Sequence, residues 1–533
     1  MKAPKSIRTL LILWACVVGA ATADAQPADP TRPAEPPKPR PPRGDARAAP
    51  AQPRTTARAA DEPTAPTTRP RTEARPAPER TQPPRTASPE PPSTAPAPKT
   101  APKKDTGFGF GSYGRVGIST DGQGSPGRQL NLASHGPRLG EGPYLELDLY
   151  YKMRPYRHVR LQTVVTLAFT EQLFHFDGDW TSALALRNLY LEGQDLFVRG
   201  LSVWIGSRMY RGDDIYLLDF WPLDNLNTVG GGVSFSFGRT KVAWHLGVNR
   251  LKDQFQYQEV AVPGLNNTSE LIVLLNRQRM ITSLKGVQEF GGRGGKVGAK
   301  LKVYGEYHFL PAGTLDAHLP TEDQEHLRAD HGWLAGLQAG LWNFGPRSHL
   351  NLFLRYAQGL AAYGEFAIPF GLATDKRAAN AREFLLAVSA NFELKRWFGV
   401  QFGGYVRYFK DADPNEYDWD DGWEYVAVVR PHLFLHKLFA VAFELSYQAR
   451  DPAGLSPWTH QAETPGVTKL AVMPLLTFGK GTYARPQFRL IYMVIHQNHS
   501  ARMSHNPEDP RHDLKVAHYI GIQAEWWFNS TYR

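Results

Sequence analysis

The chain has 533 residues, a formal net charge of +10 and one cysteine. Between 27 and 105 it carries 15 Lys and Arg residues against 9 Asp and Glu, so most of the excess positive charge belongs to this segment. The charge is therefore no reason to expect a nucleic-acid partner, and a chain with a single cysteine cannot form an internal disulfide.

The first 25 residues predict a secretory signal peptide. Three basic residues precede an apolar run from 10 to 21, and the small-residue sequence Ala-Asp-Ala follows at 23–25. The apolar run is too short for a membrane-spanning helix. The alternative is a lipoprotein signal with Cys16 as the lipidated residue, but bulky Trp14 and the short apolar run before the cysteine argue against it.

Residues 26–106 predict a disordered linker. Pro, Ala, Thr and Arg dominate the segment, and this composition cannot bury enough apolar surface to offset the entropy lost on ordering. We expect a partly polyproline tether in the periplasm. Its arginines offer a contact with an anionic cell-wall polymer, although a solvated linker is the favoured interpretation.

Residues 107–533 predict a succession of long β-strands. Leucine alternates with Tyr, Glu and Asp between 144 and 149, and similar runs of period two recur to the end of the chain. The predicted strands lie near 109–119, 144–149, 158–168, 185–191, 200–207, 230–238, 241–249, 297–308, 333–343, 348–358, 382–394, 398–409, 423–433, 439–447, 467–478, 485–495 and 522–528. One further strand is expected within 253–290.

These strands favour an antiparallel outer-membrane β-barrel. Many are 9–13 residues long, whereas strands of soluble proteins have about 5–6 residues and a membrane crossing needs about 9–11. No run of 18 apolar residues is present, and a closed sheet pairs every backbone group that lipid would otherwise leave unpaired. The aromatic end of the last strand, at 526–528, is usual in outer-membrane proteins. A soluble exported β-protein is the alternative.

One face of these strands carries aromatic rings beside charges. Tyr113 and Arg115 share a face of the first strand, and Tyr483, Arg485 and Arg489 share a face late in the chain. Aromatic rings facing water are unfavourable unless something covers them. Sugars suit such a surface, because their C–H faces pack on rings while their hydroxyls bond ionised side chains. For any single ring, packing beneath an inserted loop is the alternative.

The stretch 203–224 departs from strand alternation. It begins as a strand and then mixes charged residues with aromatic ones, a combination suited to a polar ring compound; these residues are Arg211, Asp213, Asp214, Asp219, Tyr216, Phe220 and Trp221. Asp213 and Asp214 are a poor glycosidase pair, because adjacent residues of an extended segment point apart. No nucleophile-elbow, zinc-protease or phosphate-loop motif stands out, and the histidines lack ligand spacing. We therefore expect no enzyme activity, cofactor or bound metal.

The same stretch resembles a known family. The sequence S-V-W-I-G-S-R-M-Y-R-G-D-D-I-Y-L-L-D-F-W, at 202–221, is similar to the third-loop region of maltoporins, the carbohydrate-specific porins of the outer membrane. F-G-S-Y-G-R-V-G-I resembles their first strand, R-L-G followed by Y-L-E-L their second, and A-R-P-Q-F-R and G-I-Q-A-E-W-W-F their late strands. The likeness runs in patches through most of 107–533.

The resemblance implies an 18-stranded barrel with an inward-folded third loop, assembled as a homotrimer in the outer membrane of a Gram-negative bacterium. It also implies an oligosaccharide substrate that slides along aromatic rings. The implied aromatic residues are Tyr113, Tyr144, Trp221, Tyr483, Trp527 and Trp180, the last reaching into the neighbouring subunit. The implied polar contacts are Arg115, Arg138, Glu146, Arg187, Asp214 and Asp219.

Some positions depart from the family pattern. Gly212 stands where the family has an arginine, although Arg211 is adjacent, and Trp221 replaces the usual constriction tyrosine. Ala335 aligns with a track phenylalanine, with Trp333 nearby. Because of these changes, the sequence does not decide whether the substrate is a maltodextrin, sucrose or another glycoside. Three other functions stay in view: a non-specific porin, a plugged structural or adhesive barrel, and an exported glycan hydrolase.

Overall fold

The computed structural model describes residues 106–170, 183–265, 268–414 and 418–529. Within them, 18 antiparallel strands form one sheet. Strand β1 (Gly107–Thr120) pairs with β2 (Tyr144–Lys152) and also with β22 (Val516–Phe528), so the first and last strands close the barrel. The predicted 18-stranded barrel is confirmed. The predicted signal peptide and nearly all of the predicted linker lie outside the described residues.

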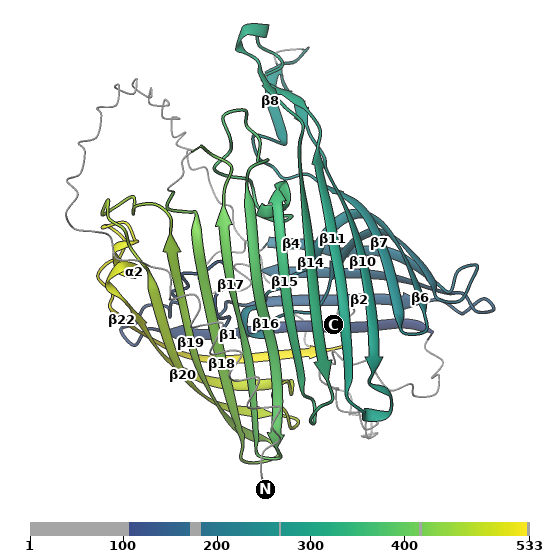
Figure 1. Ribbon diagram of the computed structural model, residues 1–533, viewed down its shortest axis with the longest axis vertical. Coiled ribbons are helices and arrows are strands. Elements are labelled where there is room, and N and C mark those ends of the chain that lie inside the picture. Colours follow the sequence, from purple (N-terminus) through teal and green to yellow (C-terminus); the bar gives the residue numbers. More distant parts are fainter. Residues whose placement is uncertain (1–105, 171–182, 266–267, 415–417, 530–533) are drawn as a thin grey trace, which may run out of the picture. The chain divides into compact units, whose positions relative to one another are not determined.

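Each strand of the barrel pairs with the next barrel strand along the chain, and Figure 1 shows β14, β15, β16 and β17 side by side in that order. The other barrel strands are β3 (Arg160–Thr170), β4 (Ala183–Gln194), β5 (Leu201–Arg211), β6 (Asn225–Phe237), β7 (Thr240–Asn249), β10 (Arg279–Gly291), β11 (Gly298–Leu310), β14 (Asp330–Trp342), β15 (His349–Gly359), β16 (Arg382–Lys395), β17 (Phe398–Lys410), β18 (Gly422–Phe434), β19 (Phe439–Pro452), β20 (Gly466–Thr477) and β21 (Gln487–Gln497).

Short elements lie between the barrel strands. They are the strands β8 (Tyr257–Pro263), β9 (Ser269–Asn276), β12 (Gly313–Leu315) and β13 (Glu325–Leu327), the 3-10 turns η2 (Tyr216–Leu218), η4 (Arg293–Gly295), η5 (Thr321–Asp323) and η6 (Leu360–Tyr363), and the helix α2 (His499–Met503). No helix among the described residues is long and apolar enough to cross a membrane.

The alternation of side chains sorts the two faces of the barrel wall. On β19, Phe443 and Leu445 are exposed, whereas Glu444 and Ser446 between them are buried. The same pattern places Phe488 and Leu490 outside on β21. A lipid-facing surface of this kind requires apolar side chains, so the polar and charged residues of the wall gather on the inner face.

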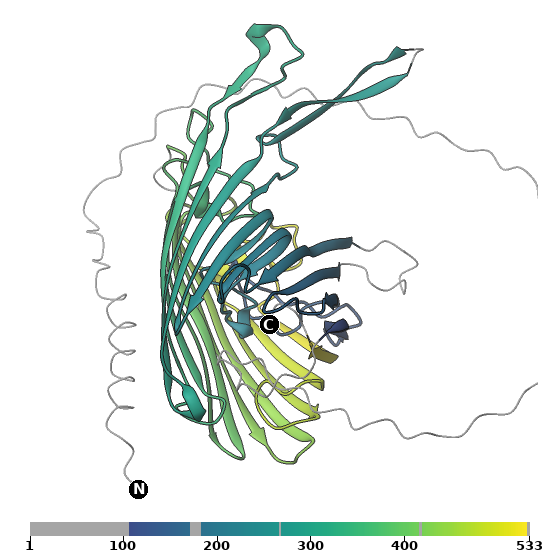
Figure 2. The same ribbon diagram turned by 90° about the vertical axis from the view of Figure 1, so that its right-hand side faces the viewer.

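The segment 253–290 holds more structure than the single predicted strand. It contains β8 and β9, which pair as a hairpin separate from the barrel, followed by the barrel strand β10. Figures 1 and 2 show this hairpin extending beyond the end of the barrel wall. The predicted barrel strand is β10. The additional hairpin was not predicted, because β8 and β9 alternate like barrel strands and the pattern alone does not say which sheet a strand joins.

Among the described residues, loops 1 and 3 enter the interior of the barrel. Loop 1 (121–143) crosses to the far wall, where the backbone N–H groups of Leu132 and Ala133 donate to Gln448 of β19 at 3.0 and 3.1 Å. Loop 3 (212–224) contains η2 and is largely buried. The two loops also meet each other, because the N–H of Arg138 donates to the carbonyl of Leu217 at 3.1 Å. The inward-folded third loop is thus present.

Candidate functional site

A continuous row of aromatic rings lies inside the barrel. The rings of Tyr144 and Tyr113 have centroids 5.8 Å apart, and Tyr113 faces Trp527 across the pairing of β1 with β22. Tyr216 of loop 3 then packs edge-on against Trp527 at 5.9 Å and against Tyr483 at 5.4 Å. Four of these five rings were predicted as the aromatic track. The fifth, Tyr216, was not.

The charge at the centre of this row is the carboxylate of Glu525, which is fully buried. Arg485 and Arg489 each approach it at 2.8 Å, and Arg138 lies at 3.4 Å. The hydroxyl of Tyr216 donates to the same carboxylate at 3.0 Å. A buried carboxylate requires such partners, so Glu525 fixes the position of loop 3 beneath the aromatic row.

Two predicted arginines surround Tyr113. Arg138 bonds the Tyr113 hydroxyl, and Arg115 donates to it at 3.1 Å. Both arginines also pair with Glu141 of loop 1, at 3.2 and 2.9 Å. Burial of Glu141 raises the pKa of its carboxyl group, against the lowering effect of these two guanidinium groups. Charged residues of loop 1 therefore cover the Tyr113 end of the aromatic row.

A second polar group lies beside Tyr144. Arg187 of β4 pairs with Glu146 of β2 at 2.6 Å, and the Tyr144 hydroxyl bonds both side chains. Three predicted site residues are thus brought together from β2 and β4, which lie on either side of β3. Trp180, predicted to act in the neighbouring subunit, lies outside the described residues.

Loop 3 is held to the opposite wall by aspartates and lysines. Asp213 pairs with Lys300 at 2.7 Å and Lys302 at 3.3 Å. Asp224 pairs with Lys285 at 2.8 Å and Lys302 at 3.1 Å. Burial would raise the pKa of Asp213, but the two lysine charges outweigh it and hold that pKa well below its usual value. The ionised carboxylates of Asp213 and Asp224 thus anchor the two ends of loop 3.

The departures from the family pattern now have a physical account. A Cβ atom on Gly212 would lie 1.8 Å from Oδ1 of Asp224, so a side chain at this position would displace the carboxylate that pairs with Lys285 and Lys302. The guanidinium of Arg211 instead lies over the ring of Trp221, 4.1 Å from its centroid. Trp221 is only 8% exposed. The two unusual residues Arg211 and Trp221 therefore form one cation–π pair beside the loop.

The two remaining predicted aspartates belong to loop 3. Asp219 ends η2 with a φ of 50°, a left-handed conformation that Asp tolerates, and lies 3.9 Å from Arg138. Asp214 is half-buried on the same loop. Asp219 thus joins the cluster around Tyr113. The sequence pattern missed Glu525 and Tyr216, although Glu525 alternates with Trp527 and so belongs to the same inner face.

The position corresponding to the family's track phenylalanine differs from the expectation. Ala335 and Trp333 on β14 both lie on the exposed outer face. Leu334 and Gly336 occupy the inner face, and Leu223 of loop 3 would be 2.5 Å from a Cβ on Gly336. Loop 3 therefore takes the space that a ring at this point of the wall would need.

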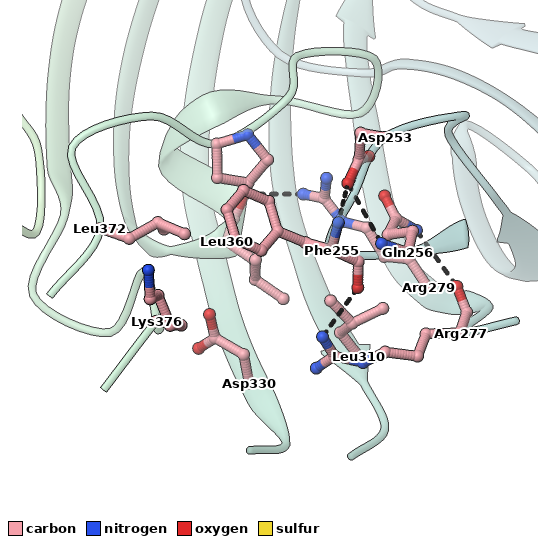
Figure 3. Close-up of a pocket in the computed structure, with 11 residues that line it drawn as sticks. Asp253, Phe255, Gln256, Arg277, Arg279, Leu310, Asp330, Leu360, Leu372 and Lys376 are labelled. Atoms are coloured by element: carbon pink, nitrogen blue, oxygen red, sulfur yellow. Dashed lines mark hydrogen bonds between the residues drawn. The ribbon is translucent and has the colours of Figure 1, made fainter. Parts of the chain in front are cut away.

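A small cavity lies at one end of the barrel, between the loops that carry Asp253 and Leu360 (Figure 3). Arg279 projects into it and donates to the Leu360 carbonyl at 2.6 Å. The cavity measures about 20 Å³, the space of about one water molecule. It is too small for a sugar ring and belongs to the packing of the loops.

Comparisons with known proteins match most of the chain. The sequence profile of the LamB porin family matches residues 108–528. A maltoporin of Vibrio cholerae serotype O1, El Tor Inaba strain, is 24% identical over 450 residues, which cover 78% of this chain and 94% of that protein.

Solved structures of outer-membrane proteins also align. The channel DcaP of Acinetobacter baumannii aligns with a TM-score of 0.40 and 11% identity, over 79% of this chain and 98% of that one. OmpT of Vibrio cholerae aligns with a TM-score of 0.38 and 11% identity, over 80% and 99%.

Proposed function

Because the chain belongs to the LamB porin family, and is thus an outer-membrane porin, we propose that it is a sugar-selective channel for maltodextrins or related oligosaccharides. Its substrate crosses by facilitated diffusion along the concentration gradient. The relative from Vibrio cholerae is named as a maltoporin, which supports a glucose-based substrate.

The row of Tyr144, Tyr113, Tyr216, Trp527 and Tyr483 carries this proposal. Three contacts between these rings have centroid spacings of 5.4–5.9 Å, and Tyr113 lies opposite Trp527 in the strand register. A sugar chain would pack on these rings once loops 1 and 3 uncover them. Ionised side chains on both sides offer charge-assisted hydrogen bonds to the hydroxyls. Each subsite must bind weakly, because a sugar held tightly would not leave the channel.

The polar residues have proposed roles of the same kind. Arg115, Arg138, Glu146 and Arg187 would contact sugar hydroxyls from the wall. Asp214 and Asp219, both on loop 3, would accept hydrogen bonds from sugar hydroxyls, and Trp221 would narrow the passage. Trp180 would extend the track from a neighbouring subunit of a homotrimer.

Current block in planar lipid bilayers tests the proposal. Purified protein should give single channels whose current falls as maltodextrin is added, with longer chains blocking at lower concentration because they cover more subsites. The same measurement with sucrose and with an unrelated oligosaccharide shows which sugars the channel selects. A channel that no sugar blocks would be a non-specific porin.

The plugged-barrel alternative is favoured by one observation. Tyr113 and Trp527 are only 3% and 6% exposed, because loops 1 and 3 cover them. If the loops keep this position, the two rings stay covered and no sugar reaches them. The absence of any single-channel current from correctly inserted protein would establish that function in place of transport.

A further inference from the structure

The short turns at one end of the barrel share a composition that the long loops lack. They join β2 to β3, β4 to β5, β6 to β7, β10 to β11, β14 to β15, β16 to β17, β18 to β19 and β20 to β21. Each turn carries at least one arginine or lysine, and together they contain one carboxylate, that of Asp195. In Figure 1 this end of the barrel lies opposite the hairpin of β8 and β9. The short turns of outer-membrane barrels face the periplasm.

The basic side chains at these turns are exposed. We call this set the basic rim, and its members are Arg154, Arg157, Arg199, Arg239, Lys296, Arg347, Lys395, Arg396, Lys437 and Lys480. Among the described residues, Arg347 is the one member that forms an ion pair, with Glu393 at 3.1 Å. The carboxylate of Asp195 pairs with Arg160 of β3, outside the rim, at 2.8 Å. The rim therefore presents positive charge that the protein itself does not neutralise.

An exposed apolar side chain accompanies the basic residues at every one of these turns. Tyr156 is 72% exposed and Phe197 is 88% exposed. The others are Phe237, Val297, Phe344, Trp397, Leu435, Leu438 and Phe478. The guanidinium of Arg157 lies over the ring of Tyr156, 5.5 Å from its centroid. Apolar and positive groups are thus presented together, which is typical of residues at the level of lipid headgroups.

The apolar side chains of the turns continue the lipid-facing surface of the barrel. Phe488 lies on the outer face of β21, and the ring of Phe478 in the preceding turn is 6.5 Å from it. The rings of Phe235 and Phe237, at the end of β6, are 5.6 Å apart and both exposed. The basic rim therefore lies where the lipid-facing wall ends.

The long loops at the other end do not share this charge balance. Loop 5 (311–329) carries four carboxylates and one arginine. Loop 7 (411–421) carries six carboxylates and no arginine or lysine. The excess of positive charge at the short turns is thus not a general property of the segments that connect the strands.

We propose that the basic rim binds the headgroups of anionic phospholipids in the periplasmic leaflet of the outer membrane. Each arginine or lysine beside a membrane surface adds to the attraction for acidic lipid, and the attraction fades within a Debye length. The rim meets this condition because its residues lie beside the lipid-facing wall. Acidic lipids would therefore gather around the periplasmic end of the barrel.

The apolar side chains favour lipid over an anionic cell-wall polymer as the partner of the rim. A water-soluble polymer offers no apolar layer in which rings such as Tyr156 and Phe197 could be buried. A bilayer offers such a layer directly below its charged headgroups. The two partners are distinguished by experiment below.

Native mass spectrometry of the full-length protein in neutral detergent micelles tests the proposal. Phosphatidylglycerol should bind with a lower dissociation constant than phosphatidylcholine, which has a phosphate but no net charge. The triple substitution Arg199→Gln, Arg239→Gln and Lys296→Gln removes three charges from turns that are neighbours around the barrel. It should weaken phosphatidylglycerol binding by about 5-fold or more, the contribution of one such charge near an acidic surface. Phosphatidylcholine binding should not change.

The matched control removes the same charge from the opposite end of the barrel. Arg128→Gln, Lys252→Gln and Lys515→Gln alter three exposed residues of the long loops that form no ion pair among the described residues. This variant should bind phosphatidylglycerol like the wild type. Arg199→Lys with Arg239→Lys should also keep the preference, because the attraction depends on charge. An unchanged thermal unfolding midpoint in lipid-free micelles would show that the triple variant is folded.

Three results would overturn the proposal: equal binding of the two lipids by the wild type, unchanged phosphatidylglycerol binding in the triple variant, or an equal loss in the long-loop control. A further result would assign the rim to the cell-wall polymer instead. In that case the triple variant would be retained less on isolated cell wall and would bind phospholipid normally. None of these measurements depends on whether a sugar passes through the channel.

Discussion

The carboxylate of Glu525 holds three arginines and the Tyr216 hydroxyl at one point inside the barrel. Two of the arginines, Arg485 and Arg489, come from the chain just before and within β21, and the third comes from loop 1. Removing one partner of a buried ion pair costs about 3–5 kcal/mol, because the other charge stays buried. This cluster therefore decides where loops 1 and 3 lie relative to the aromatic row.

Tyr216 is predicted to control the width of the passage. Tyr216→Ala removes a ring that packs against Trp527 and Tyr483, so single-channel conductance should rise. Tyr216→Phe keeps the ring and loses the hydroxyl, which donates to Glu525 and accepts from Arg485, at a cost of about 1–3 kcal/mol for each hydrogen bond. Its conductance should stay near that of the wild type. Equal conductance in the alanine variant and the wild type would contradict this role.

Trp221→Ala should weaken the block of current by maltodextrin and widen the pore. The substitution removes the ring on which Arg211 lies and so releases the guanidinium from loop 3. The measurement is the sugar concentration that halves the current, together with the open-channel conductance.

Trp333→Ala is the matched control for Trp221→Ala, because Trp333 lies on the exposed outer face of the wall. It should change neither quantity. An unchanged sugar block in Trp221→Ala would remove this residue from the constriction.

At this scale the sequence predicted the residues that lie on strands better than those on loops. Period-two alternation placed Tyr113, Glu146 and Trp527 on the inner face, and the structure has them there. Tyr216 lies in the 3-10 turn η2, where the backbone reverses between Ile215 and Phe220 and no periodicity tells which way a side chain points. The sequence therefore did not predict that the ring of Tyr216 covers Tyr113 and Trp527.

Among the elements, the barrel strands follow from sequence and the loop hairpins do not. Long alternating runs such as 398–409 and 423–433 match β17 and β18 within one or two residues. The strands β8 and β9 alternate similarly but pair only with each other. Pairing partners depend on the whole sheet, and local patterns do not contain that information.

Loop 6 is predicted to lose stability as the pH rises. Burial raises the pKa of Glu365 in loop 6 (360–381) from 4.5 to about 8; the hydrogen bond from the N–H of Asn227 lowers this pKa, and the negative charge of Glu306 raises it further. A carboxyl group with a raised folded pKa is easier to ionise when the structure opens. Its contribution is therefore most favourable below about pH 4.5 and is lost progressively as the pH rises toward 8.

Glu365→Gln should remove this dependence, because glutamine stays neutral at every pH. Thermal unfolding midpoints of the two proteins should be close near pH 5 and should diverge toward pH 8, with the wild type falling below the variant. The pKa of Asp411, raised to about 7, acts equally in both proteins and cancels in the comparison. Parallel curves would show that Glu365 does not titrate in this way.

Across the whole molecule, the excess positive charge and the barrel are separate features. The segment 27–105 carries a net charge of +6 and lies before the first barrel strand, β1. Deleting 27–105 behind the signal peptide should leave single-channel conductance and sugar block unchanged, because no residue of the proposed track comes from it. The measurement is the bilayer recording used for the intact protein.

The deletion needs a control for insertion. Outer-membrane fractions should contain equal amounts of the two proteins before their currents are compared. Lost conductance in inserted, truncated protein would assign the segment a part in the channel. Weaker retention of the truncated protein on isolated cell wall, with normal conductance, would instead support a contact with an anionic polymer.

The pairing of β1 with β22 has a consequence for synthesis and assembly. Tyr113 and Trp527 lie more than 400 positions apart, yet they become neighbours in the register of these two strands. The binding surface is therefore built on the seam where the sheet closes. A chain that stops before its final strand, or a barrel in which β1 and β22 have not paired, lacks this surface. Ligand binding therefore indicates that the barrel has closed.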